Sequence, residues 1–356
     1  RPRPTPRAAP APAPGAAPAR RVATGAAKGG GLPPPGPADP DRPDSRGQVV
    51  VLDGARAGEL AGILRFAYDG TPLPVTEKDL KRTDITTRDI DRGSHRHYLK
   101  KEIAEAPSSI RKTLRGRLTE EQGLVRPLLG EESLPSRICA ALKDGTIERI
   151  RVIGQGTAAV AGQAVAEAIR DALADLPVEV DAMPATEVSG FHLRDEMADT
   201  LFVAISQSGT TTDTNRTVDL LRRRGAPVVA IVNRRHSDLT ERVDGVIYTS
   251  DGRDVEMSVA STKAFYSQVA AGIVLGEAFA HACGVGDPQR RDRLLRALAA
   301  LPERMREMLG REENVALAAR QTAPRRRHWA IVGNGRNRIA AQEIRIKLSE
   351  LCYKSI

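Results

Sequence analysis

Short apolar runs alternate with longer amphipathic segments from residue 148 almost to the last residue of the chain. Chains with this alternation form a parallel sheet with helices packed on both of its faces. The sequence therefore predicts an α/β fold with strands at Ile150–Ile153, Val178–Val180, Leu201–Ile205, Val228–Val232 and Val246–Tyr248. Helices are expected between and after these strands, at residues 161–173, 212–224, 261–282 and 289–309.

The order strand, Gly-x-Gly turn and helix occurs a second time near the end of the sequence. Trp329–Val332 is an expected strand, Gly333-Asn334-Gly335 a turn and Ile339–Tyr353 a helix. This repetition predicts one complete α/β module followed by the start of a second. Because the pattern runs to Ile356 and the chain begins with Arg1, we expect a piece of a longer protein that is cut at both ends.

The first 47 residues contain 13 of the 24 prolines and almost no large apolar side chain. Such a segment cannot bury enough apolar surface to offset its ordering entropy, so we expect a disordered linker. It carries eight basic residues against three aspartates, and so supplies five of the nine net positive charges. The remainder of the chain is nearly balanced in charge, which argues against a nucleic-acid partner.

The segment between this linker and residue 148 has a mixed pattern. Strands are expected at Val49–Leu52 and Ile63–Tyr68, and the apolar spacing from Pro107 to Leu118 indicates a helix that starts near that proline. The three cysteines of the chain are far apart and lack metal-ligand spacing, so we expect neither a disulfide framework nor a metal site. The longest apolar stretch is too short to cross a bilayer, so no membrane partner is expected.

A run of hydroxyl side chains directly follows the expected strand Leu201–Ile205. It contains Ser206, Ser208 and Thr211, together with the amide of Gln207, and it leads into a helix. Hydroxyls and the free N–H groups of a helix N-terminus suit a phosphate dianion. The run has neither the lysine nor the acidic residue of a triphosphate site, so a phosphate monoester is favoured. The alternative is an ordinary Ser/Thr-rich helix cap.

Two further motifs stand at expected helix starts. Gly154-Gln155-Gly156-Thr157 follows a strand, and its glycines let backbone N–H groups approach an anion, although a plain turn would use the same residues. Ser258–Phe265 precedes the long helix and begins with small residues, with Ser261 and Thr262 placed to cap it. Neither motif alone is specific.

Together, these motifs carry a family resemblance. Ser206–Thr214, followed about fifty residues later by Val259–Phe265, resembles the sugar isomerase (SIS) fold. More narrowly, the pair resembles the isomerase half of the glutamine–fructose-6-phosphate aminotransferases, and the segment around His97-Tyr98 is similar to their interdomain linker. The resemblance implies four segments: the linker 1–47, the end of a glutaminase-like domain with its linker at 48–105, a first SIS domain at 106–295, and the start of a second at 296–356.

The resemblance also implies roles for individual residues. The residues that hold the sugar phosphate would be Thr157, Ser206, Gln207, Ser208, Thr211 and Ser261. Val259 and Ala260 match positions whose backbone faces the sugar.

Glu343, Lys347 and Glu350 match the helix that bears the catalytic groups, and their spacing places them on one helix face. By this resemblance Lys347 assists ring opening and forms an imine at C2, and Glu350 moves the proton between C1 and C2. The alternative is an exposed helix with ordinary ion pairs.

The activity implied is the conversion of fructose 6-phosphate to glucosamine 6-phosphate by a cytoplasmic homodimer, with ammonia from glutamine and without a cofactor. The chain alone is expected to be inactive. Two alternatives remain: a regulatory SIS protein that binds a phosphosugar without turnover, and another sugar-phosphate isomerase or deglycase on this fold. Ala158-Ala159, where the family has Ser-Tyr, favours the binding protein, whereas Lys347 and Glu350 favour the enzyme.

Overall fold

The computed structural model describes residues 21–23, 48–67, 69–77, 80, 90–352 and 354–356, and the chain divides into two units, residues 1–83 and 84–356. In the first unit β1 (Arg21–Ala23), β2 (Gln48–Leu52), β3 (Ile63–Ala67) and β4 (Pro72–Leu73) form an antiparallel sheet in that order, with short 3-10 turns at Gly54–Arg56 and Leu60–Gly62. Both strands expected in this unit are present. Apart from β1, the predicted linker 1–47 lies outside the described residues.

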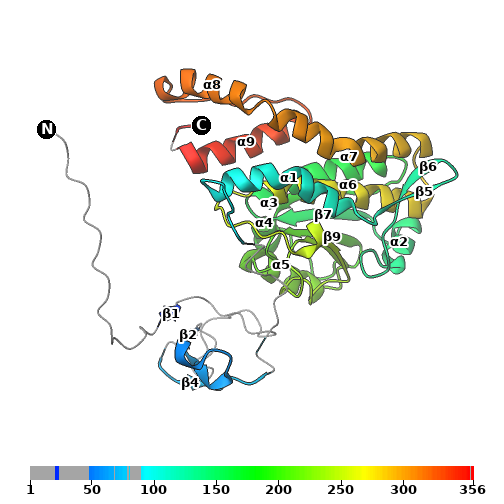
Figure 1. The fold of residues 1–356 in the computed structure, drawn as a ribbon. Helices are drawn as coiled ribbons and strands as arrows, with labels where there is room; N and C mark the ends of the chain where they lie inside the picture. Colours follow the sequence, from blue (N-terminus) through cyan, green and yellow to red (C-terminus); the bar gives the residue numbers. More distant parts are fainter. Residues whose placement is uncertain (1–20, 24–47, 68, 78–79, 81–89, 353) are drawn as a thin grey trace. The chain divides into compact units, whose positions relative to one another are not determined.

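The second unit is built on a five-stranded sheet (Figure 1). Its strands are β7 (Arg149–Gly154), β8 (Glu179–Pro184), β9 (Thr200–Ser206), β10 (Val228–Val232) and β11 (Gly245–Tyr248). All neighbours are parallel and the order is β11-β10-β9-β7-β8, which confirms the α/β prediction and all five expected strands. A separate antiparallel pair, β5 (Leu118–Glu121) and β6 (Leu124–Pro127), was not expected.

Helices cover both faces of the parallel sheet. The residues of α2, α3 and α6 pack on one face and those of α4 and α5 on the other, and α1 and α7 form an outer layer on α6. The helices are α1 (Tyr98–Leu114), α2 (Ser136–Lys143), α3 (Thr157–Ala172), α4 (Ala185–Phe191), α5 (Thr212–Arg222), α6 (Lys263–Cys283), α7 (Pro288–Leu309), α8 (Glu312–Thr322) and α9 (Asn337–Cys352), with 3-10 turns at Ser250–Gly252 and Ala323–Arg325.

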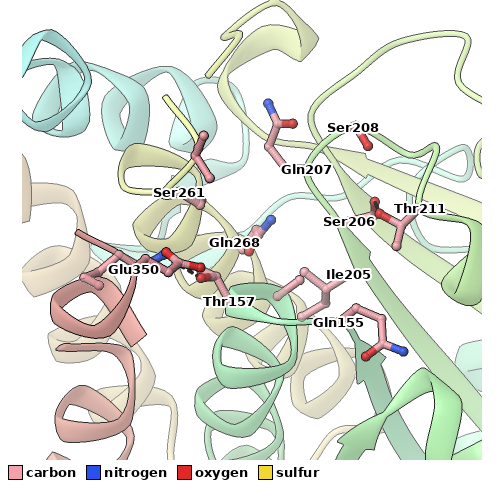
Figure 2. A pocket seen from close by; sticks show the side chains of 13 residues that line it. Gln155, Thr157, Ile205, Ser206, Gln207, Ser208, Thr211, Ser261, Gln268 and Glu350 are labelled. Atoms are coloured by element: carbon pink, nitrogen blue, oxygen red, sulfur yellow. Dashed lines mark hydrogen bonds and ion pairs between the residues drawn. The ribbon is translucent and has the colours of Figure 1, made fainter. Parts of the chain in front are cut away.

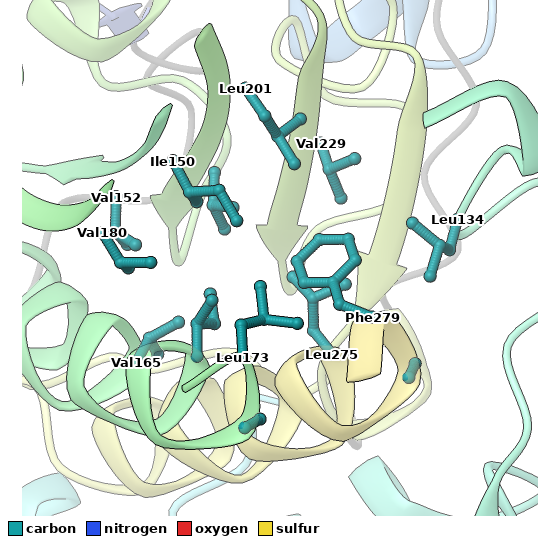
Figure 3. Packing of buried hydrophobic residues seen from close by; sticks show 14 of the residues in the cluster. Leu134, Ile150, Val152, Val165, Leu173, Val180, Leu201, Val229, Leu275 and Phe279 are labelled. Carbon is teal, nitrogen blue, oxygen red and sulfur yellow. The ribbon is translucent and has the colours of Figure 1, made fainter. Parts of the chain in front are cut away.

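The main core lies between the sheet and helices α3 and α6. Figure 3 shows Ile150 and Leu201 of the strands facing Val165, Leu275 and Phe279 of these helices, and all five are completely buried. Full burial of one such side chain contributes about 1.5–3 kcal/mol. The apolar runs that predicted the strands therefore also supply this core.

One predicted helix start is wrong. The helix expected to begin near Pro107 begins at Tyr98 instead, and Pro107 lies inside it. An interior proline removes one backbone hydrogen bond and costs about 3 kcal/mol or more. The helix continues because Ile110 and Leu114 pack with α6 and α7, which outweighs the local preference. Its last expected residue, Leu118, lies in β5.

The strand expected at Trp329–Val332 is also not formed, although α9 follows close to the predicted place. A strand needs a neighbour for its backbone hydrogen bonds. In the described part of the chain this segment has only the isolated bridge between His328 and Ser355 beside it. The division into segments 1–47, 48–105, 106–295 and 296–356 stays a prediction.

Among the described residues, no helix is both long and apolar enough to cross a membrane. Cys139, Cys283 and Cys352 are free thiols. The order of the parallel sheet matters most for function. The chain leaves β7 toward β8 on one side and later returns to β9 on the other, so a switch point lies between the carboxyl ends of β7 and β9. Open α/β sheets bind ligands at such points.

Candidate functional site

The hydroxyl-rich loop after β9 is folded by its own side chains. Ser206 is buried at the end of the strand, and its Oγ accepts a hydrogen bond from the backbone N–H of Gly209 at 3.0 Å. Its Oγ also lies 3.3 Å from Thr211 Oγ1, while Ser208 Oγ lies 2.9 Å from Thr210 Oγ1. These bonds curl the loop so that several hydroxyls gather at the N-terminus of α5, where the helix dipole favours an anion.

Gly209 is required at the centre of this loop. It has φ +63°, and a Cβ there would lie 2.0 Å from Ser237 Oγ. Its carbonyl accepts hydrogen bonds from Asn215 Nδ2 at 3.2 Å and from the Leu239 backbone N–H at 3.0 Å. The loop is therefore fixed on both sides before any ligand arrives.

The turn after β7 brings a second element to the same edge of the sheet. Gly156 has φ +56°, and a Cβ on Gly154 would lie 2.8 Å from the carbonyl carbon of Ala158. The chain can therefore turn tightly into α3, and Thr157 becomes the first residue of that helix. Thr157 Oγ1 faces α9, where it accepts a hydrogen bond from Lys347 Nζ at 2.8 Å.

Two carboxylates, the buried Glu102 and the half-buried Glu256, hold the segment before α6. Glu102 of α1 accepts hydrogen bonds from the backbone N–H groups of Met257 at 2.5 Å and Ser258 at 3.2 Å, and another from Ser258 Oγ. Glu256 accepts from the backbone N–H of Thr262 at 2.7 Å and from Ser261 Oγ at 2.7 Å. This stretch of chain is thereby fastened at both ends, with the 95% exposed Val259 between them.

The three acid and amine groups expected on one helix face do meet on α9. Lys347 Nζ lies 3.4 Å from Glu343 Oε1 and 3.3 Å from Glu350 Oε2. Glu343 is buried, and Thr157 Oγ1 donates to its Oε1 at 3.3 Å. Burial raises the pKa of the Glu343 carboxyl, although Lys347 and Thr157 act to lower it.

These elements surround one open pocket with a cavity volume of about 230 Å³. Figure 2 shows Ser206, Ser208 and Thr211 on one side of it and Thr157 and Glu350 on the other. Sites for drug-sized ligands usually have about 300–1,000 Å³, so this open pocket suits a small ligand. The pocket is lined by Gln155, Thr157, Ala158, Ile205, Ser206, Gln207, Ser208, Thr211, Val259, Ser261, Gln268, Lys347 and Glu350.

Most of the residues predicted from the sequence thus lie around a single pocket. Two do not line it: Ala260 is buried and its carbonyl accepts from Ser258 Oγ at 3.0 Å, and Glu343 lies behind Lys347 and Thr157. The roles of all of them stay predictions. Gln155 and Gln268 line the pocket and were not expected to bind a ligand.

A signal for Gln268 existed in the sequence, because a glutamine among the apolar residues of the long helix α6 is unusual there.

Chemically, the pocket pairs a neutral hydroxyl cradle with an amine flanked by carboxylates. The cradle suits a phosphate through hydrogen bonds and the helix dipole. The amine and carboxylates suit proton transfer at a carbon or oxygen held across the pocket. No group of three or more histidine, cysteine, aspartate or glutamate side chains among the described residues is arranged to hold a metal ion.

Comparison with known proteins agrees with this geometry. Residues 146–278, which include β7, the hydroxyl loop and most of α6, match the model of the SIS domain family. This part of the chain therefore has the SIS-type fold. The chain is also related to the glutamine–fructose-6-phosphate aminotransferases: it is 34% identical to the Symbiobacterium thermophilum enzyme, over 86% of this chain and 48% of that protein. The Thermus thermophilus enzyme is 33% identical, over 81% of this chain and 47% of that protein.

The chain therefore spans about half the length of these relatives. Among solved structures, it resembles the C-terminal domain of the glucosamine-fructose-6-phosphate aminotransferase from Francisella tularensis. The TM-score is 0.63 at 24% identity, and the match covers 74% of this chain and 70% of that one. At this identity the structural match supports the fold, which is the SIS-type parallel sheet expected from the sequence.

Proposed function

We propose that this chain is the sugar-phosphate half of an aminotransferase that converts fructose 6-phosphate to glucosamine 6-phosphate, with ammonia from glutamine. The single observation that carries the proposal is the pocket at the switch point. Its hydroxyl cradle faces Lys347 and Glu350 across the open pocket. The relatives named above act on fructose 6-phosphate and glutamine by their names, which agrees with a phosphate cradle opposite an amine. We further propose that the protein is a cytoplasmic homodimer.

In this proposal the phosphate binds to the hydroxyls of Ser206, Ser208 and Thr211, with the amide of Gln207 and the first N–H groups of α5. The other end of the sugar then lies at α9. Lys347 promotes ring opening by a proton transfer and condenses with the C2 carbonyl, which releases water and forms an imine. Ammonia replaces the lysine at C2. Glu350 takes a proton from C1 and returns it to C2, which completes the isomerisation.

The binding step is tested by calorimetry with fructose 6-phosphate on the full-length protein. Ser206→Ala together with Ser208→Ala is expected to weaken binding by about 1–3 kcal/mol, because hydrogen bonds to a charged phosphate are lost. Ser189→Ala is the control, since that serine lies on α4, donates to the Thr186 carbonyl and does not line the pocket. Unchanged affinity in the double variant would contradict the proposed site.

The catalytic step is tested separately by product formation. Lys347→Ala and Glu350→Gln should each abolish turnover while leaving sugar-phosphate binding nearly intact. Turnover that survives both changes would contradict the proposed roles.

One observation favours a second candidate, a SIS protein that binds a phosphosugar without turnover. Ala158 lines the pocket and presents a methyl group where a hydroxyl could contact the sugar. In that case the full-length protein would bind fructose 6-phosphate and form no glucosamine 6-phosphate with either glutamine or ammonia.

A further inference from the structure

Gln268 is the pocket residue whose hydrogen bonding is incomplete. It lies in the second turn of α6 and is only 2% exposed, yet it lines the pocket. Its Oε1 is buried and has no hydrogen-bond partner among the described residues. A buried polar atom without a partner is uncommon in folded proteins and calls for a physical explanation.

The position of Gln268 indicates what its partner would be. In Figure 2 its side chain lies between the hydroxyl loop, which holds Ser206, and the opposite wall, which holds Thr157 and Glu350. A sugar phosphate that spans the pocket would carry its phosphate at one end and its reacting carbons at the other. The part of such a ligand nearest to Gln268 is the middle of the carbon chain, which bears hydroxyl groups.

The side chain is also held in place. The preceding residue, Ser267, is completely buried and its Oγ donates to Ser109 Oγ of α1 at 3.0 Å. This contact fixes the rotation of α6 about its axis at this point. Gln268 therefore stays directed at the pocket and would not turn to solvent to satisfy its oxygen.

We propose that Gln268 is a specificity-determining residue whose side-chain amide forms a hydrogen bond with a hydroxyl in the middle of the sugar chain. This proposal rests on the proposed function of the pocket. A site that provides a buried amide rejects an analogue without the matching hydroxyl, because the amide is then left without that partner. The residue selects hydroxylated ketose phosphates over deoxy analogues and makes no contact with the phosphate itself.

The test measures the affinities of the full-length wild-type protein and its variants for fructose 6-phosphate and for its 3-deoxy and 4-deoxy analogues. Gln268→Met, which keeps the length of the side chain, should weaken fructose 6-phosphate binding about tenfold. The same substitution should leave the affinity for one of the two deoxy analogues unchanged, and the affinity for inorganic phosphate should not move. Gln163→Met is the matched control, because Gln163 Oε1 of α3 is also buried without a partner in the described part but does not line the pocket.

Equal loss of affinity for fructose 6-phosphate and for both analogues would overturn the role of Gln268, and so would no loss at all. If the wild-type protein fails to bind fructose 6-phosphate, the proposed function and this inference both fail. If Gln268→Met does not fold, the affinities of the wild-type protein for the three sugars test the proposal instead. The proposal requires one deoxy analogue to bind about tenfold more weakly than fructose 6-phosphate, and equal affinities would overturn it.

Discussion

Replacing Gly209 by alanine tests whether the hydroxyl loop is as tightly constrained as its contacts indicate. A residue with a side chain at φ +63° pays about 1–2 kcal/mol for the left-handed backbone. The new Cβ would also lie 2.0 Å from Ser237 Oγ and 2.6 Å from Ser237 Cβ. Ser237 is buried, so it cannot move into solvent, and overpacking of this kind costs about 1–3 kcal/mol. The expected loss of unfolding free energy is therefore about 2–5 kcal/mol.

Gly225→Ala is a matched control, because this glycine has φ +77° and a Cβ there would meet only Ala198 Cβ, at 3.8 Å. The unfolding free energy of Gly225→Ala should fall only by the cost of the left-handed backbone conformation, about 1–2 kcal/mol. Urea unfolding measures both variants, and calorimetry with fructose 6-phosphate should show weaker binding for Gly209→Ala alone. Equal destabilisation of the two variants, with unchanged binding, would refute the reasoning.

Two further changes test the surroundings of the pocket. Glu102→Gln should lower the unfolding free energy by about 1–3 kcal/mol and weaken fructose 6-phosphate binding. The amide lacks the negative charge that strengthens the bonds from the Met257 and Ser258 N–H groups, and its NH2 group cannot accept from Ser258 Oγ. A free energy of unfolding in urea within about 0.5 kcal/mol of wild type would contradict this. Burial raises the pKa of the Glu343 carboxyl above its ordinary value of 4.5. The protonated carboxyl therefore contributes fully to the unfolding free energy below pH 4.5, and this contribution is lost as the pH rises through the raised pKa. Glu343→Gln should therefore gain stability relative to wild type as the pH increases from about 4 to 7, and a difference that does not vary with pH in urea unfolding would argue against a raised pKa.

The parallel sheet could be predicted because its strands are continuous apolar runs. Val228–Val232 is completely buried on both faces, so nearly every position of that strand carries the same signal. The hydroxyl loop could be predicted for a related reason. It follows a buried strand, and in a parallel sheet the carboxyl ends of the strands meet at one edge.

Features that depend on distant contacts could not be predicted in the same way. Glu102 fastens Met257 and Ser258 across more than 150 residues of sequence, and no local pattern marks that pairing. The helix α1 passes through Pro107 because tertiary packing overrides a local preference. Conversely, Trp329–Val332 has strand-like residues but no strand beside it in the described part of the chain, so its composition alone gave the wrong answer.

The central claim is tested most directly by an X-ray structure of the full-length protein with fructose 6-phosphate bound. We expect electron density for the phosphate within hydrogen-bond distance of Ser206, Ser208 and Thr211, and C2 of the sugar beside Lys347. A pocket that stays empty at saturating fructose 6-phosphate would contradict it, as would a phosphate that binds at any other place.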